Sequence, residues 1–505
     1  MSPPENPIKI PINITAAAER QSANWDIQNA PKNYVSLVLT QAGSAFFAFA
    51  SVWLITKTLG SEGYGGIIAI IAASQVAQVL VNWTSVAVVR FGVDEFIETE
   101  KIARTFWLRL LILLPNLLLV LLTANFWFPP LADWLKLSAD AVWLVFLHFA
   151  AIALWIHIQY SLQAVKMPRL QGGLLMIERV LIFSGLLVLS ATDRLDAVSA
   201  VICYAVAPLT ATLAGFWILR KFVFVSFSMD TIFWRKIVVF SLPLIPFTIT
   251  GYLSGGADAI FISKFLSTQD LGIYSVATQI SGIALQLPTL ANSLLLPLFV
   301  SLQKEGKTNR LQHYFKHTFP TLILFWGLFS TVAALIGYFL IPIVFGEEFA
   351  QSTRPLWILL ATSVLSLPPL IGYGALSNAT STTYISMFGA AFAALANISF
   401  NFLLIPIFGA EGCAWATAIM YLTTTSVFVV LLRRVVEIPV SWLFLAIIPS
   451  VGGAISISLT GNPWFSLVVC LSLSILVIYL KNKSFRETLL FLKRFKNIKK
   501  TNNNE

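Results

Sequence analysis

The chain has 505 residues, of which 57% are hydrophobic and 11% are charged, with a formal net charge of +10. Soluble domains carry roughly 25% charged residues. No soluble fold of this length could bury so much apolar surface, so the composition excludes a soluble protein and indicates a polytopic membrane protein. Cys203, Cys413 and Cys470 all lie in apolar segments, which predicts buried thiols and neither disulfides nor a metal site.

A spanning helix needs about 20 mostly apolar residues, and this criterion predicts about fourteen spans. Residues 1–33 before them are polar and proline-rich, without the apolar core of a signal peptide. The expected fold class is therefore an all-α polytopic membrane protein. The predicted spans are 34–57, 64–89, 105–128, 139–165, 170–192, 195–219, 237–266, 270–302, 318–346, 354–377, 382–407, 409–432, 440–460 and 462–480.

The basic residues alternate from one loop to the next. Most of them fall in the two tails and in the loops that share a side with the tails. By the positive-inside rule both termini then lie in the cytoplasm. This distribution explains the net charge without a nucleic-acid partner. A count of about twelve spans would keep the same parity, so parity alone does not establish the last two. The basic residues of the opposite side are Lys57, Lys136, Arg194, Lys264 and Arg354.

An internal repeat divides the chain. Residues 55–65 align without gaps on residues 262–272 at an offset of 207, and Ser74 matches Ser281 at the same offset. One match follows the first span and the other follows the seventh, which favours duplication of a half of about six spans. Both halves then insert the same way up, with a site between them. The predicted divisions are a tail (1–33), an N-lobe (34–220), a linker (221–236), a C-lobe (237–434), two further helices (440–480) and a basic tail (481–505).

Helix breakers gather in the span at 237–266. Non-helical backbone at membrane depth is tolerated only against protein or a water-filled cavity. The pattern predicts a cavity wall or hinge, with ordinary proline kinks as the alternative. The hinge candidates are Pro243, Pro246, Gly255 and Gly256.

Arg179 is the clearest ionisable candidate, because it lies about nine residues into its span, near the bilayer centre. It suits an anionic head group in a central cavity, and a structural ion pair is the alternative. Arg90 and Arg109 are further cationic candidates. Arg90 ends the second span and is a candidate contact at the cavity mouth, but the sequence favours a role in topology and in anchoring to lipid phosphate. Arg109 is close enough to a span end to snorkel.

Asp258 follows the glycine pair and can titrate, bind a cation or hold a structural partner. Lys264 is a candidate for receiving an anionic group on the outer side, or a snorkelling helix end. His148 and His157 can carry protons or pack through hydrogen bonds. Asn397 and Asn401 lie one helical turn apart, which predicts hydrogen bonds between helices.

No catalytic motif stands out. Gly306, Lys307 and Thr308 resemble the end of a phosphate-binding loop, but the required upstream glycine is absent because position 301 is Ser. No loop is long enough for a soluble enzyme domain. We expect neither an enzyme nor a cofactor, and the choice of coupling ion, H⁺ or Na⁺, stays open.

Four segments carry a resemblance to a known family. They are residues 59–65 (LGSEGYG), residues 241–246 (SLPLIP) with Asp258 and residues 271–275 (LGIYS), residues 344–350 (VFGEEFA), and residues 397–412 (NISFNFLLIPIFGAEG). Together they resemble the bacterial polysaccharide-biosynthesis flippases of the multidrug/oligosaccharidyl-lipid/polysaccharide exporter superfamily. Residues 377–383 depart from the family, because the basic residue often found there is absent.

The resemblance implies two six-helix lobes around a central cavity that work by alternating access. The implied substrate is an oligosaccharide on a polyprenyl diphosphate, moved from the cytoplasmic to the periplasmic leaflet for surface polysaccharide. The last two helices would then help form a groove for the lipid tail. Expected partners are this lipid-linked substrate, membrane lipids, and a polysaccharide polymerase and ligase. The alternatives are a multidrug exporter of the same superfamily, a membrane enzyme acting on lipid-linked glycans, and a cell-wall precursor flippase.

Overall fold

The computed structural model describes residues 16–224, 230–242, 245–304, 308–379, 384–433 and 438–481. The regular structure in these ranges is helical, which confirms the predicted fold class. The N-lobe consists of α1 (Ala16–Asn82), α2 (Ser85–Thr99), α3 (Ala103–Leu122), α4 (Ala124–Leu135), η1 (Ala139–Ala141), α5 (Val142–Ala164), α6 (Pro168–Ala191) and α7 (Ala197–Val223).

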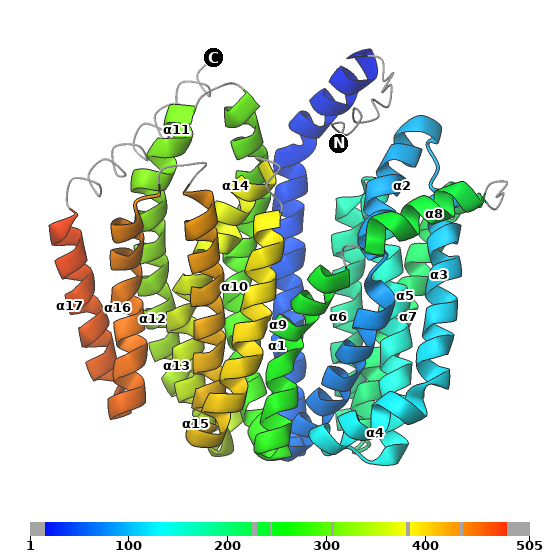
Figure 1. Cartoon of the computed structure of the whole chain (residues 1–505). Helices are drawn as coiled ribbons and strands as arrows, with labels where there is room; N and C mark the ends of the chain where they lie inside the picture. The colour runs from blue at the N-terminus through cyan, green and yellow to red at the C-terminus, as the bar shows by residue number, and fades with distance from the viewer. Residues whose placement is uncertain are drawn as a thin grey trace, which may run out of the picture.

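The second part of the chain begins with α8 (Thr231–Ser241), a short helix between the lobes. The last two helices, α16 (Val440–Thr460) and α17 (Pro463–Leu480), lie at the outer edge of the C-lobe (Figure 1). The C-lobe consists of α9 (Ile245–Phe265), α10 (Thr268–Lys304), α11 (Thr308–His313), η3 (Tyr314–Thr318), α12 (Phe319–Phe345), η4 (Glu347–Ser352), α13 (Thr353–Thr362), η5 (Ser363–Ser366), η6 (Pro368–Gly372), α14 (Tyr373–Ala379) and α15 (Tyr384–Leu432).

Nine helices in the described residues are long and apolar enough to cross a membrane, and a bent pair, Glu347–Ser366 with Pro368–Ser377, adds a tenth crossing. Two of the nine are each two spans joined at a glycine. Gly60 in α1 has φ 66° and Gly409 in α15 has φ 58°, a conformation that glycine adopts without steric cost. With α9 and α10, every predicted span has a helical counterpart, which supports the count of about fourteen.

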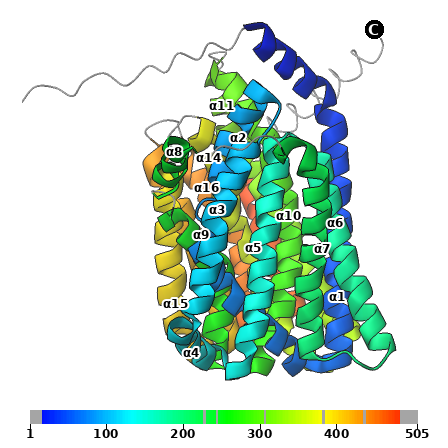
Figure 2. The same cartoon turned by 90° about the vertical axis from the view of Figure 1, so that its right-hand side faces the viewer.

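The two ends of the bundle can be named from the path of α1. This helix begins at the end where α17 finishes, the terminal end, and it turns at Gly60 at the opposite end, the far end (Figure 1). The helix α8 lies crosswise near the terminal end in both views (Figures 1 and 2). Its Phe233 and Phe240 rings pack on Phe91 of α2, with centroids 5.5 and 5.3 Å away. It therefore docks on the N-lobe.

The repeat appears in space as a symmetric contact. A Cβ added to Gly65 would lie 1.9 Å from the carbonyl oxygen of Thr268, and one added to Gly272 would lie 1.9 Å from that of Ser61. Gly65 and Ser61 match Gly272 and Thr268 at the offset of 207. The two copies of the turn thus cross backbone to backbone, and only glycine permits so close an approach. This places the pseudo-twofold axis between α1 and α10.

Further contacts hold the lobes together at the far end. Ser61 Oγ donates to Glu348 Oε2 at 2.9 Å, and the Lys136 ammonium donates to the Leu266 carbonyl oxygen. The Phe49 and Phe345 rings pack with centroids 5.5 Å apart. Nearer the terminal end, Asn82 Nδ2 of α1 donates to Tyr252 Oη of α9 at 3.2 Å.

The span predicted at 237–266 is divided. Helix α8 ends at Ser241 and α9 begins at Ile245, so α9 alone crosses the membrane there. Pro246 is the second residue of α9, where a proline needs no intrahelical amide bond. Helix α9 runs through Gly255 and Gly256 without interruption, and their role as hinge residues stays a prediction. Pro243 lies outside the described residues.

The predicted span at 354–377 is broken near its prolines. The two halves meet at an angle of 43° beside the π-helical turn Pro368–Gly372. Proline lacks the amide hydrogen that an α-helix requires, so this geometry has a local cause.

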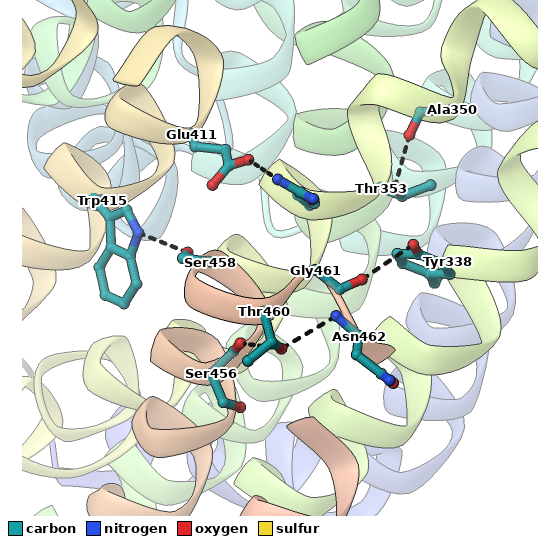
Figure 3. A network of polar contacts seen from close by, with 11 residues as sticks. Tyr338, Ala350, Thr353, Glu411, Trp415, Ser456, Ser458, Thr460, Gly461 and Asn462 are labelled. Atoms are coloured by element: carbon teal, nitrogen blue, oxygen red, sulfur yellow. Dashed lines mark hydrogen bonds and ion pairs between the residues drawn. The ribbon is translucent and has the colours of Figure 1, made fainter. Parts of the chain in front are cut away.

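Helix α16 is fastened to the C-lobe at the far end. Trp415 Nε1 donates to Ser458 Oγ at 3.1 Å, and Tyr338 Oη donates to the Gly461 carbonyl oxygen at 3.4 Å (Figure 3). Deeper in the bundle, Ser450 Oγ donates to the Ala361 carbonyl oxygen at 2.7 Å. Such hydrogen bonds supply specificity where lipid provides no hydrophobic drive for helix association.

Candidate functional site

A polar pocket of about 330 Å³ lies inside the N-lobe and reaches α10 of the C-lobe. Its wall combines hydroxyl, amide, imidazole and charged groups, which is unusual in a membrane interior and marks a candidate site. The predicted Arg179 on α6 is among its lining residues. The polar lining is Ser51, Tyr64, Ser74, Gln75, Gln78, His148, Glu178, Arg179, Tyr204 and Gln279.

Several groups in this pocket have fixed partners. His148 Nδ1 lies 2.6 Å from Ser74 Oγ, which joins α5 to α1. Glu178 is buried and accepts a hydrogen bond from Trp155 Nε1 at 3.0 Å. A buried carboxylate needs such a donor. Glu178 is therefore held by α5 and does not pair with its neighbour Arg179.

Arg179 differs from these groups because it is half-buried and unpaired. Its guanidinium makes no hydrogen bond or ion pair within the described ranges. A cation at this depth without a direct hydrogen bond or ion pair is costly. The structural ion pair left open by the sequence is thus absent from the described residues, and the pocket presents a positive charge without a partner.

A second, apolar pocket of about 270 Å³ adjoins the first and shares Gln75 with it. It lies between α1 and α9, and Gly256 lines it. A Cβ added to Gly256 would lie 2.6 Å from Gln75 Oε1. This predicted hinge glycine thus lets the two lobes approach closely beside the pocket.

Arg90 and Lys264 do not line either pocket. Arg90 Nη1 pairs with Asp94 Oδ2 at 2.5 Å on α2, where both side chains are exposed. Lys264 Nζ lies 3.8 Å from Asp133 Oδ2 and 5.1 Å from the Trp134 ring centroid, so it bridges the lobes at the far end. The structure separates these residues from Arg179.

Arg109 is fully buried on α3, away from Arg179. Its Nη2 donates to Ser85 Oγ at 2.9 Å and to Asn82 Oδ1 at 3.4 Å. It therefore does not snorkel to a span end. It sits where the second span stops and α2 begins.

Asp258 on α9 is the centre of a hydrogen-bonded cluster in the C-lobe. Its Oδ1 accepts from Asn397 Nδ2 at 3.2 Å and Asn401 Nδ2 at 3.1 Å. Its Oδ2 accepts from Tyr274 Oη at 3.1 Å and Thr417 Oγ1 at 3.0 Å. The predicted hydrogen bonding of Asn397 and Asn401 between helices is confirmed.

Every partner of Asp258 in the described part of the chain is neutral, and no Lys or Arg pairs with it there. Asn401 Oδ1 is buried without a hydrogen-bond partner. Rotation of an asparagine amide would present its oxygen beside the carboxylate. Oxygen ligands of this kind suit a hard cation, and a proton on the carboxyl group is the alternative.

A further pocket of about 520 Å³ lies at the far end of the C-lobe. Arg354 and Glu411 line it and pair with each other, with Nη1 and Oε1 3.4 Å apart. Figure 3 shows Glu411 in this region, beside Tyr338 and Thr353. Because its arginine is already paired, this pocket offers less to an anion than the Arg179 pocket does.

One polar stripe on α1 was not predicted. Ser74, Gln78 and Asn82 follow one another at four-residue intervals, which puts them on one helical face, and Ser85 is the first residue of the next helix, α2. The spacing itself was a usable signal. Asn82 Nδ2 donates to Gln78 Oε1 at 2.5 Å, so the stripe links the Arg179 pocket to Arg109. Tyr252, Tyr274 and Thr417 had no such local signal.

Comparison with known proteins supports this architecture. The family model for "Polysaccharide biosynthesis protein" matches residues 30–303, more than half of the chain. No curated protein sequence matches this chain. The structure is similar to the lipid II flippase MurJ in an inward closed conformation, with a TM-score of 0.64 and 16% identity over 90% of this chain and 100% of that one.

The structure is also similar to a multidrug resistance MATE family transporter in an inward-facing conformation. The TM-score is 0.57, with 13% identity over 79% of this chain and 97% of that chain. At these identities the likeness shows the fold. The family model shows that the chain belongs to the polysaccharide biosynthesis protein family.

Proposed function

We propose that this protein is a flippase that carries a polyprenyl-diphosphate-linked oligosaccharide from the cytoplasmic to the periplasmic leaflet of a bacterial inner membrane. The observation that carries the proposal is the unpaired Arg179 guanidinium in the N-lobe pocket. A diphosphate crossing hydrocarbon requires cationic and polar partners, and Arg179 with the amides and hydroxyls around it supplies them. The lipid tail stays in the bilayer.

Alternating access gives this pocket its direction. The basic loops support a cytoplasmic location for the terminal end, and the lobes are sealed at the far end by the Gly65–Gly272 crossing and the Ser61–Glu348 hydrogen bond. These contacts support a state that receives substrate from the terminal end. A polysaccharide polymerase and ligase would act on the product on the other side.

The Asp258 cluster supports coupling to a cation. In this proposal, H⁺ or Na⁺ binds the carboxylate, with Asn397, Asn401 and Thr417 supplying neutral oxygen ligands for Na⁺. The charge of Asp258 then changes without any movement of a basic residue. The cation gradient would bias the two lobe arrangements if the cation binds one of them more tightly.

A multidrug exporter is the second candidate, because Glu178 provides an acidic group in the same pocket. Glu178 is held by Trp155, however, whereas Arg179 has no partner in the described residues. The charge available to a substrate is thus positive, which favours an anionic head group over a cationic drug.

Deletion of the gene in its bacterial host tests the proposal. We expect one surface polysaccharide to disappear while its lipid-linked unit accumulates on the cytoplasmic side, measured by extraction of polyprenyl-linked glycans. Complementation with the intact gene is the control. Intact polysaccharides together with new sensitivity to cationic compounds would replace the flippase by the multidrug exporter.

A further inference from the structure

Arg109 is a buried cation with unused hydrogen-bonding capacity. It is completely buried, and its only contacts among the described hydrogen bonds run from Nη2 to Ser85 and Asn82. Its Nε and Nη1 have no hydrogen-bond partner there, and no carboxylate pairs with it in the described residues. A guanidinium left in this state is strongly destabilising. The arrangement points to an anionic ligand.

A helix begins beside this guanidinium. The second span stops at Asn82, and α2 starts at Ser85 and runs for 15 residues. Its N-cap residue Thr84 makes no side-chain capping bond, and Thr84 Oγ1 is buried and unpartnered. The amide groups and the positive end of the dipole at a helix N-terminus favour anions. Arg109 contacts the first residue of this helix.

A third element adds donors to the same region. His157 on α5 is buried, and neither ring nitrogen has a hydrogen-bond partner in the described part of the structure. Its ring lies 4.4 Å from that of Phe106, one turn before Arg109 on α3. Three helices thus bring unpartnered donor groups close to one another.

We propose that Arg109 and the N-terminus of α2, with Thr84 and His157, form a second anion site that takes the phosphate groups of a polyprenyl diphosphate. The inference rests on the proposed flippase function and deepens it. The site lies toward the terminal end, since Asn82 is 22 residues beyond the turn at Gly60. The stripe of Ser74, Gln78 and Asn82 on α1 then leads from this site to the Arg179 pocket. The diphosphate meets Arg109 first and Arg179 second.

The contact between Asn82 and Tyr252 connects this site to the C-lobe. Asn82 accepts from Arg109 and donates to Tyr252 Oη at 3.2 Å. Because Arg109 is fully enclosed, a ligand reaches it only when neighbouring groups separate. Among the contacts around Arg109, the hydrogen bond from Asn82 to Tyr252 joins the two lobes, so its opening would also let the lobes move. A ligand bound at Arg109 would thus affect how the two lobes are arranged.

The test uses the full-length protein in detergent micelles and three probes: farnesyl diphosphate, inorganic diphosphate and uncharged farnesol. Affinity and the ligand-induced rise in Tm are measured for the wild type, Arg109→Gln and Thr84→Val. Arg220→Gln is the matched control, because Arg220 is an exposed arginine of the same end that stacks on Trp217 at 3.6 Å.

We expect Arg109→Gln to weaken farnesyl diphosphate binding at least ten-fold while its ligand-free Tm stays equal or rises, because an unpaired buried charge is removed. Arg220→Gln should bind like the wild type. A lower ligand-free Tm with wild-type affinity would overturn the site and leave Arg109 a structural role. If Arg109→Gln does not fold, Thr84→Val decides: several-fold weaker binding supports the site, and unchanged affinity overturns it.

The probes separate the ligand sources. Tighter binding of farnesyl diphosphate than of inorganic diphosphate supports a lipid head group, and equal binding of the two overturns that assignment in favour of a free anion. The outcome is also separable from the proposed function. If the deletion strain accumulates lipid-linked glycan but Arg109→Gln binds with wild-type affinity, only this inference is wrong. If Arg109→Gln binds ten-fold more weakly but the deletion strain has no glycan phenotype, only the flippase proposal is wrong.

Discussion

The two lobes descend from one duplicated unit, yet their polar sites have opposite character. The N-lobe pocket holds a cation, Arg179, without a partner in the described residues, whereas the C-lobe cluster holds a carboxylate, Asp258, with four neutral donors. A bare charge invites an oppositely charged ligand, while a carboxylate solvated by neutral groups can exchange them for a small cation. The duplication thus preserved the helical architecture of the two lobes, while the charged side chains inside them diverged.

The largest effect is expected at Arg179. Arg179→Gln keeps a polar side chain and removes the charge, so the substrate diphosphate loses a charge-assisted contact of about 1.5–3 kcal/mol. We expect transport to fall roughly ten- to hundred-fold, measured as surface polysaccharide at equal protein level. Arg194→Gln, which changes an exposed arginine near the far end, is the control. Normal polysaccharide in Arg179→Gln would remove the N-lobe pocket from the mechanism.

Asp258→Asn tests whether the C-lobe cluster binds a cation. The substitution puts an amide among four donors, so we expect about 1–3 kcal/mol of lost stability and loss of any dependence of Tm on the cation. Tm is measured in sodium and choline chloride and over a range of pH. Asp94→Asn, which alters an exposed carboxylate paired with Arg90, is the control. A Tm of the wild type that ignores both Na⁺ and pH would speak against a coupling site.

Gly65→Ala and Gly272→Ala test the symmetric backbone crossing between the two lobes. Either methyl group would meet a carbonyl oxygen at 1.9 Å, so each variant should lose about 1–3 kcal/mol from overpacking. Symmetry predicts similar losses for the two. Gly66→Ala and Gly282→Ala are matched controls, because nothing lies within 4 Å of either added Cβ. Clearly unequal Tm losses would show that the crossing is not equivalent from the two sides.

The smallest effect is expected at Asp230, a charge outside both sites and outside the spans. The backbone amide of Phe233 donates to it at 3.0 Å, and Arg104 lies 3.2 Å away. The amide first and Arg104 second hold the pKa of this carboxyl below its ordinary value. A lowered folded-state pKa contributes stability above the unfolded value of about 3.9, and this stability is lost as pH falls through the folded pKa.

We therefore expect a small Tm difference between the wild type and Asp230→Asn at pH 6 that shrinks on acidification toward about pH 3. Thermal unfolding at stepped pH measures it. A difference that stays constant over this range would mean that the cap acts through geometry and not through charge.

Much of the architecture was predictable because its causes are local. The length of each apolar run decides whether it can cross a bilayer, and the repeated turn at residues 55–65 and 262–272 could be aligned by eye. Arg179 could be singled out from its position within an apolar run, and it is among the residues that line a polar pocket. The glycine pair in the seventh predicted span gave no sign that α9 would run through Gly255 and Gly256 as one helix.

The sequence by itself determined the class of protein, the duplication and the identity of the few charged groups at membrane depth, since each is encoded in a short stretch. Only the tertiary structure decided which of those groups meet. Asp258 contacts Asn397 and Thr417, which lie 139 and 159 residues away, and Arg109 lies beside the break at Asn82 and not beside Arg179. Such meetings depend on the rotation and offset of every helix in the bundle, which the packing of the whole chain sets.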